Sequence, residues 1–244
     1  MAIQPNESNS GYGHEEACAR VASRFGERWL RMYAGQKLRS DPIFPAAFEL
    51  LRDSPQPLVD VGCGVGLLAF YLRERNFQAP ISGIDRDGRK IERACRVARR
   101  RYRDLSFTEV DASDSIERSG NMALFDVLHY LSPNEQSRLL QRLAARVAPG
   151  GMLVIRDCPR DRNARFWLTR TAERFAQATR WNLRTPLHFP AREQILSAFN
   201  PVEFTARIEP LWGRTPFNNH LFVFRRRLDA AVPAGAGRSD NSGS

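Results

Sequence analysis

The feature that most constrains this chain is a glycine-rich turn that follows a short apolar stretch. The turn runs from Asp60 to Gly66 and reads Asp-Val-Gly-Cys-Gly-Val-Gly, directly after Leu58 and Val59. A glycine turn that leads from a buried strand into a helix lets a ligand lie against bare backbone. Dinucleotides and S-adenosylmethionine (SAM) both bind to turns of this kind. The turn therefore predicts an α/β fold with a ligand site at the end of a strand.

The glycine spacing and a nearby acid distinguish these two ligands. A dinucleotide loop reads G-x-G-x-x-G, and Leu67 stands at its third glycine position here. A pyrophosphate needs backbone N–H groups without a carboxylate close by, whereas Asp60 precedes the first glycine. SAM carries an ammonium group and a sulfonium, which a carboxylate attracts. The turn favours SAM, and the alternative is a loop whose glycines serve only the backbone.

Strands and helices alternate after the turn. The predicted strands are Leu58–Val61, Ile81–Ile84, Leu105–Val110, Leu124–Leu128 and Met152–Arg156, and the predicted helices between them are Gly66–Glu74, Asp87–Arg103 and Pro133–Val147. This order predicts a doubly wound α/β fold with a mostly parallel sheet and right-handed crossovers. Val202–Ile208 and Leu221–Arg225 are expected to form an antiparallel edge pair. Further helices are predicted at Glu15–Gln36, Pro45–Arg52, Asn163–Trp181 and Ala191–Phe199.

Acidic residues follow several of these strands. Asp85 ends the second strand and can hold both hydroxyls of a ribose, and Asp111 follows the third and can accept from an adenine amino group. Asp126 and His129 stand at the end of the fourth strand. The carboxyl ends of parallel strands share one edge of the sheet, where open α/β folds bind ligands. An isolated acid is more often a helix cap, but together these positions favour SAM.

The chain resembles the class I SAM-dependent methyltransferases over about residues 55 to 158. The matching stretches are Val59–Gly66, Gly83–Asp85, Val110–Ala112, Phe125–His129 and Ala148–Ile155. The resemblance implies a Rossmann-like seven-stranded sheet whose last strand, Leu221–Arg225, runs antiparallel. It also implies cofactor roles for Asp60, Gly62, Gly64, Asp85 and Asp111. Our predicted cofactor site further includes Cys63, Gly66, Arg86, Ala112 and Asp126.

The segments outside this core are expected to surround it as parts of one domain. We expect a disordered N-terminus over residues 1–13, a methyltransferase domain over 14–227 and a disordered tail over 228–244. Within the domain, 14–54 would form a helical lid, 55–158 the SAM-binding core and 159–220 insertions on the acceptor side. Lys37–Pro42 and Gly213–Asn219 are similar to segments of methyltransferases encoded with bacterial aryl-polyene pigment pathways.

Charge and cysteine usage limit the partners and the compartment. The net charge is +10, but nearly all of the positive charge is arginine, since Lys37 and Lys90 are the only lysines. This bias can reflect coding composition, so a nucleic-acid partner is disfavoured rather than excluded. Residues 1–13 are polar and are not expected to act as a secretory signal, and no apolar run is long enough to span a membrane. The four cysteines have no metal-like spacing, so we expect free thiols and a cytoplasmic protein.

The sequence disfavours several classes of methyl acceptor. The Asn/Asp-Pro-Pro-Tyr motif that goes with amino-group methylation is absent after the fourth strand, where the chain reads Asp126-Val127-Leu128-His129. Cys158 follows the fifth strand, but the Pro-Cys pair expected of a cytosine C5 methyltransferase is absent. Asp126 and Asp157 are too few acids to indicate a metal-assisted catechol site, so no metal is predicted.

His129 is the leading candidate for an acceptor contact or a general base, because it stands at the strand end nearest the expected methyl group. A histidine that packs near adenine or caps the next helix is the equal alternative. His188 lies in the region that commonly covers the acceptor and is the second candidate. Methyl transfer can proceed mainly through proximity and orientation, so a catalytic residue is not required.

The sequence thus predicts a SAM-dependent enzyme of secondary metabolism. Its acceptor would be an oxygen or carbon of a small aromatic or acyl molecule. The acceptor could be tethered to an acidic acyl carrier protein that docks on Arg89, Arg93, Arg96 and Arg100, although such a row is more often an ordinary solvated helix face. The alternatives are an RNA-modifying methyltransferase and a non-catalytic binding protein with the same fold.

Overall fold

The structure is a computed structural model, and it describes residues 11–102, 104–112, 116–161, 164–178, 186–213 and 216–229. Its centre is a seven-stranded sheet in the order β3-β2-β1-β4-β5-β7-β6. The strands are β1 Leu58–Val61, β2 Ile81–Asp85, β3 Leu105–Glu109, β4 Asn121–Phe125, β5 Met152–Asp157, β6 Phe204–Pro210 and β7 His220–Arg226. The first five are parallel, and β7 pairs antiparallel with both β5 and β6. The predicted doubly wound sheet with an antiparallel last strand is confirmed.

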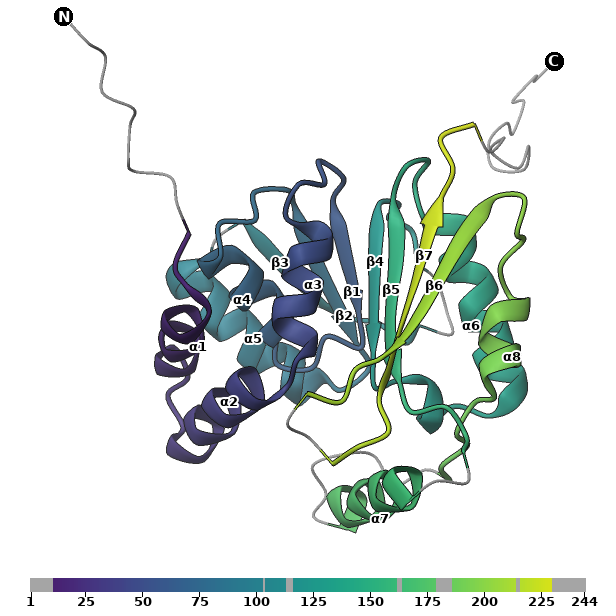
Figure 1. The fold of residues 1–244 in the computed structure, drawn as a ribbon. Helices are drawn as coiled ribbons and strands as arrows, with labels where there is room; N and C mark the ends of the chain where they lie inside the picture. Colours follow the sequence, from purple (N-terminus) through teal and green to yellow (C-terminus); the bar gives the residue numbers. More distant parts are fainter. Residues whose placement is uncertain are drawn as a thin grey trace, which may run out of the picture.

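Helices cover both faces of the sheet (Figure 1). The helices are α1 His14–Ser23, α2 Arg28–Ser40, α3 Ile43–Leu51, α4 Leu67–Glu74, α5 Gly88–Arg101, α6 Pro133–Arg146, α7 Ala164–Ala178 and α8 Arg192–Ser197. Helices α1 to α5 pack over one apolar core, and α6 and α8 over a second. Successive strand residues face opposite sides, so Leu58 belongs to the first core and Val59 to the second.

The N-terminal segment differs from the single helix predicted over Glu15–Gln36. It forms α1 and α2, and the chain turns between them at residues 24–27. Gly26 is a poor helix former, and the carbonyl of Phe25 accepts hydrogen bonds from the Arg31 guanidinium at 3.2 and 3.3 Å. These bonds satisfy a carbonyl that a continuous helix would have used. The turn lets α1 pack against α4 while α2 lies over the end of the sheet.

Strand β4 begins and ends three residues earlier than predicted. The prediction missed Asn121 because a polar residue at the start of a strand looks like a loop. The Asn121 side chain is fully buried, donates to Ser54 Oγ at 2.8 Å and accepts from the backbone N–H of Met152 at 3.0 Å. Asp126 has a φ of +57°, which ends the strand, and Leu128–Tyr130 forms a single 3₁₀ turn.

Some of the predictions fall on residues outside the described ranges. These are the predicted disorder of 1–10 and 230–244, the predicted helix positions 103, 163 and 179–181, and Arg214 and Thr215 in the second flank. Among the described helices, none is both long and apolar enough to cross a membrane.

Candidate functional site

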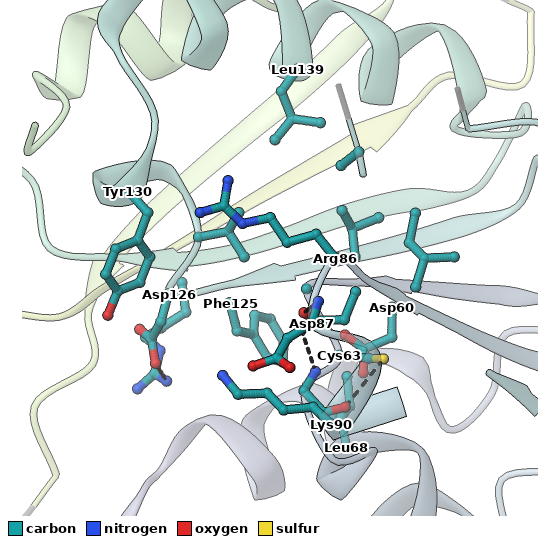
Figure 2. A pocket seen from close by; sticks show the side chains of 18 of the residues that line it. Asp60, Cys63, Leu68, Arg86, Asp87, Lys90, Phe125, Asp126, Tyr130 and Leu139 are labelled. Atoms are coloured by element: carbon teal, nitrogen blue, oxygen red, sulfur yellow. Dashed lines mark hydrogen bonds and ion pairs between the residues drawn. The ribbon is translucent and has the colours of Figure 1, made fainter. Parts of the chain in front are cut away.

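A cavity of about 640 Å³ opens where β1, β2 and β4 end. It lies between these strand ends and α2, α3 and α6, which also contribute to its wall (Figure 2). The predicted cofactor residues line it with the exception of Gly66, namely Asp60, Gly62, Cys63, Gly64, Asp85, Arg86, Asp111, Ala112 and Asp126. The cavity is of the size that small-molecule sites in proteins have.

The glycine loop presents backbone to this cavity. Gly62 and Gly64 have φ angles of +75° and +56°, which favour glycine. A side chain at Gly62 would also clash, since a Cβ there would lie 2.3 Å from Val127. At Gly64 a Cβ would meet no atom within 4 Å, so the backbone faces open space. The loop therefore leaves room for a ligand that lies directly on the chain.

Asp60 places a carboxyl group beneath the loop, with only 3% of the residue exposed. Burial, together with the nearby Asp85 carboxylate, raises its pKa to about 7. The ionised form of Asp60 is thus disfavoured until a positive charge arrives. The ammonium and sulfonium of SAM supply such a charge, so this position fits the predicted cofactor.

The acids at the ends of β2 and β3 lie further along the same wall. Asp85 accepts from the backbone N–H of Gly64 at 2.8 Å and from that of Asp87 at 2.9 Å. Asp111 and Arg86 also line the cavity, together with Leu139 of α6. The cavity thus offers carboxylates that can bind hydroxyl and amino groups, an apolar side chain and a planar guanidinium. Those are the contacts that a ribose and an adenine require.

The other end of the cavity, the aromatic end, carries the ring of Tyr130 together with charged side chains. Figure 2 shows Tyr130 and Asp126 there, on the opposite side of the cavity from Asp60 and Cys63. The cavity lining also includes Tyr33, Lys37, Ile43, Phe44, Phe125 and Arg156, of which Lys37 and Arg156 contact Asp126. Helices α2 and α3 contribute four of them, so the N-terminal helices form part of the cavity wall.

Four charged residues form an ion cluster at this end: Lys37, Asp41, Asp126 and Arg156. The buried guanidinium of Arg156 donates to Asp41 Oδ2 at 2.7 Å and to Asp126. Lys37 Nζ lies 2.8 Å from Asp41 Oδ2 and 3.6 Å from Asp126 Oδ2. Burial raises the pKa of Asp41, but Arg156 and Lys37 outweigh this and hold that pKa well below its usual range. Asp41, Lys37 and Arg156 are therefore charged at neutral pH.

Sequence reasoning missed Arg156 and Asp41 as parts of the site. Arg156 gave one signal, because it is a charged residue in an otherwise apolar strand, Met152 to Ile155, and buried charges in proteins are paired. Asp41 lies in the flanking segment Lys37–Pro42, whose sequence gives no sign of an ion pair with a distant strand. Tyr130 gave no signal, since its position depends on the 3₁₀ turn after β4.

The two histidine candidates lie away from the cavity wall. His129 is not among the lining residues that the structure describes. Its ring is buried, and Nδ1 donates to Asp157 Oδ1 at 2.9 Å. The backbone N–H of His188 donates to the carbonyl of His129 at 2.8 Å, and the His188 side chain borders a separate depression beside Phe166 and Phe189. The structure thus brings the two histidines together, but not to the aromatic end.

Within the described ranges, no three or more His, Cys, Asp or Glu side chains lie close enough together to hold a metal ion. All four cysteines are free thiols, and Cys158 is buried.

Comparison with known proteins agrees with this geometry. A methyltransferase domain family matches residues 34–226. The trans-aconitate 2-methyltransferase of Rhodopseudomonas palustris is 29% identical over 118 residues, which cover 48% of this chain and 44% of that protein. The carboxy-S-adenosyl-L-methionine synthase of Pseudomonas aeruginosa is 26% identical over 232 residues, 88% of this chain and 85% of that protein. The chain thus spans less than half the length of the first relative and most of the second.

Solved structures share the fold at low sequence identity. The magnesium protoporphyrin IX methyltransferase of Synechocystis PCC 6803, solved with S-adenosylhomocysteine (SAH), has a TM-score of 0.61 and 16% identity, covering 87% of this chain and 97% of that one. The pyocyanin biosynthetic protein PhzM also has a TM-score of 0.61, with 18% identity over 86% of this chain and 61% of that one.

Proposed function

The chain belongs to the methyltransferase domain family and is a SAM-dependent methyltransferase, and we propose that it methylates an oxygen or carbon of a small aromatic or acyl acceptor. The observation that supports this acceptor class is the division of the cavity. One end carries the glycine loop with Asp60, and Tyr130 lies at the opposite end, while Tyr33, Phe44 and Phe125 add further aromatic rings to the cavity lining. Aromatic walls of this kind suit a flat or apolar acceptor.

The residues of this chain would contribute mainly binding and orientation. Asp60 would face the positive charges of the cofactor, Asp85 its ribose hydroxyls and Asp111 its adenine. Bound SAM supplies an electrophilic methyl group. The aromatic end would hold the acceptor in line with that group and keep water away, and such positioning can provide much of the rate enhancement.

An acyl acceptor tethered to an acidic carrier protein is a further part of the proposal. The arginine row on α5 is adjacent to α2, because Arg93 Nε lies 3.4 Å from Glu27 Oε1, just before α2 begins. A carrier docked on α5 would thus sit beside a helix that lines the cavity. Within the row, Arg89 pairs with Asp87, and Arg96 pairs with Glu92 and Glu27, so part of the charge is already neutralised. The test replaces Arg96 and Arg100 by glutamate and measures turnover of a carrier-bound acceptor. An unchanged turnover would argue against this docking.

The direct test incubates the purified protein with methyl-labelled SAM and an extract of bacterial metabolites, followed by mass spectrometry. We expect label in a small molecule whose methyl group is on oxygen or carbon. Label in RNA would instead favour the RNA-modifying alternative, which also predicts a salt-sensitive affinity for RNA. Detection of carboxy-S-adenosyl-L-methionine would instead favour the reaction after which the Pseudomonas aeruginosa relative is named. Failure to bind SAM in calorimetry would point to a non-catalytic protein.

The proposal places this chemistry in the cytoplasm. The presence of four free cysteines and the absence of disulfides among the described residues support a reducing compartment. The secondary-metabolic setting follows only from the resemblance of the flanking segments.

A further inference from the structure

The distribution of lysine in this chain is uneven. The sequence has 37 basic Lys and Arg residues, and only Lys37 and Lys90 are lysines. Both line the cavity. Lysine is a compact ammonium with three rotatable donors, whereas arginine is a planar fork, and the two are not interchangeable at a close-fitting site. A chain that uses arginine at nearly every other basic position thus keeps its lysines at the cavity.

The surroundings of Lys37 fix its ammonium group at the aromatic end. Nζ pairs with Asp41 one helical turn further along and with Asp126 across the cavity wall. About 30% of the Lys37 side chain is exposed. An ammonium carries three N–H donors. The two ion pairs therefore orient the group and leave it a donor for a ligand in the cavity.

Lys37 is suited to serve as a cation and not as a base. Burial and the Arg156 guanidinium lower its pKa, but Asp41 and Asp126 raise it more, so that the net shift is upward. A lysine that acts as a general base needs the opposite shift. Lys37 therefore stays protonated throughout the neutral range.

Lys37 is the more exposed of the two cations in the ion cluster. About 30% of its side chain is exposed, against 3% for Arg156, whose guanidinium is held by Asp41 and Asp126. The ammonium of Lys37 is thus the positive group of the cluster that a negatively charged acceptor oxygen can reach, and the aromatic walls would hold the body of the same molecule.

We propose that Lys37 binds an acidic oxygen of the acceptor, so that the acceptor reacts as an oxyanion, either a phenolate or a carboxylate. This inference rests on the proposed function and narrows its acceptor to one class. A lone pair of the oxyanion forms the new O–C bond to the methyl carbon while the C–S bond breaks and its electron pair passes to sulfur. The products are SAH and a methyl ether or ester. No proton has to be removed in this step, so no general base at the cavity wall is required.

The role of Lys37 predicts a specific kinetic effect. The negative charge on the acceptor decreases as the new bond forms, so Lys37 binds the ground state at least as tightly as the transition state. Removing it should raise KM about tenfold or more, which is the effect of losing a charge-assisted hydrogen bond, while kcat at saturation changes little. For a phenolic acceptor, the pH at which the rate rises should also shift upward.

The presence of only two lysines makes a direct binding test possible. Protein grown with lysine labelled with ¹³C at Cε gives one signal for each lysine, and Lys37→Arg assigns them. The SAH-saturated protein is titrated with benzoate and with 4-nitrophenolate, each compared with a neutral counterpart, benzamide and 4-nitroanisole. We expect one anion to shift the Lys37 signal saturably and to bind about tenfold more tightly than its neutral counterpart. The anion that does so identifies the source of the oxyanion.

The variants complete the test. Lys37→Met should abolish the preference for the anion and leave the neutral affinity unchanged, while Lys37→Arg should restore part of it. Arg207→Gln, at an exposed residue paired with Glu209, is the matched control and should have no effect. The proposal is overturned if neither anion shifts the Lys37 signal, or if the neutral compounds bind equally well. Failure of the proposed function is seen separately, as loss of SAH binding or of methyl transfer in the same preparation.

Discussion

The backbone N–H of Gly64 donates a 2.8 Å hydrogen bond to Oδ2 of Asp85, which joins the loop after β1 to the end of β2. The other oxygen of Asp85 accepts from the backbone N–H of Asp87 at 2.9 Å. Two backbone groups thus fix this carboxylate before any ligand arrives. Each oxygen keeps a second acceptor site, and a ribose has two adjacent hydroxyls to donate to them.

Replacing Asp85 should weaken cofactor binding in two ways. Asp85→Ala removes the acceptors for the ribose and also releases the N–H of Gly64, so the glycine loop loses one of its supports. We expect the free energy of SAH binding, measured by calorimetry, to become about 1–3 kcal/mol less favourable. Asp104→Asn, at an exposed carboxylate paired with Arg73, is the control and should leave the affinity unchanged. Equal affinities for Asp85→Ala and the original protein would mean that the ribose does not bind here.

Asp60 makes cofactor binding dependent on pH. Its pKa is raised to about 7, so below this pH the free protein holds a neutral carboxyl group. SAM favours the ionised form, so its affinity should rise between pH 6 and about 7.5, and binding at pH 6.5 should release a proton. Calorimetry in buffers of different ionisation enthalpy measures that release. Asp60→Asn should bind SAM more weakly and without this pH dependence; an unchanged dependence would assign the proton to another group.

The same group predicts how the stability of the free protein changes with pH. The pKa of Asp60 is higher in the folded state than the ordinary value of about 4 in the unfolded state. The unfolded state therefore holds fewer protons between these values, and the free energy of unfolding falls as the pH rises through about 7. Saturating SAM should reduce this loss. Asp60→Asn should flatten the profile of the free protein, as followed by urea denaturation.

Sequence and structure agree best where the signal is local. The glycine turn and the acids at the ends of β1, β2 and β3 occupy short stretches of sequence. The structure places these residues, except Gly66, in the lining of the cavity. The ion cluster could not be predicted in this way, because Asp41 and Arg156 are 115 residues apart and meet only after α2 packs over the sheet. His129 follows β4 as expected, yet the turn beginning at Asp126 directs its ring into the core.

Glu74 joins the N-terminal helices to the core of the fold. Its carboxylate accepts from Arg20 Nε at 2.8 Å and from the hydroxyl of Tyr102, and Arg24 lies 3.6 Å away. Glu74→Leu would leave two partly buried arginines without this carboxylate. We expect the free energy of unfolding to fall by about 2–4 kcal/mol, since removing one partner of a buried pair is costly. Glu92→Gln removes an exposed pair with Arg96 and should change stability by less than about 0.5 kcal/mol. Similar effects of the two variants would contradict this role for Glu74.

His129 and Asp157 form a 2.9 Å hydrogen bond that joins the turn after β4 to the end of β5. Asp157 also accepts from the backbone N–H groups of Leu128 and Cys158 at 3.0 and 2.8 Å. The His129 ring stacks on Phe189, with the ring centroids 5.4 Å apart. A ring held in this way positions the turn that carries Tyr130 into the cavity. His129→Ala should therefore lower the free energy of unfolding by about 2–3 kcal/mol.

A positioning role and a catalytic role for His129 make opposite predictions for His129→Asn. The asparagine amide nitrogen can occupy the place of Nδ1 and donate to Asp157, so a positioning role predicts that His129→Asn recovers much of the stability and of kcat that His129→Ala loses. An amide cannot accept a proton, so a general base predicts that both variants are equally inactive and that the limb of the pH profile due to His129 disappears. Measuring kcat against pH for both variants, with the acceptor found in the labelled-SAM experiment, decides between the two. Because the ring does not line the cavity, we expect recovery by His129→Asn.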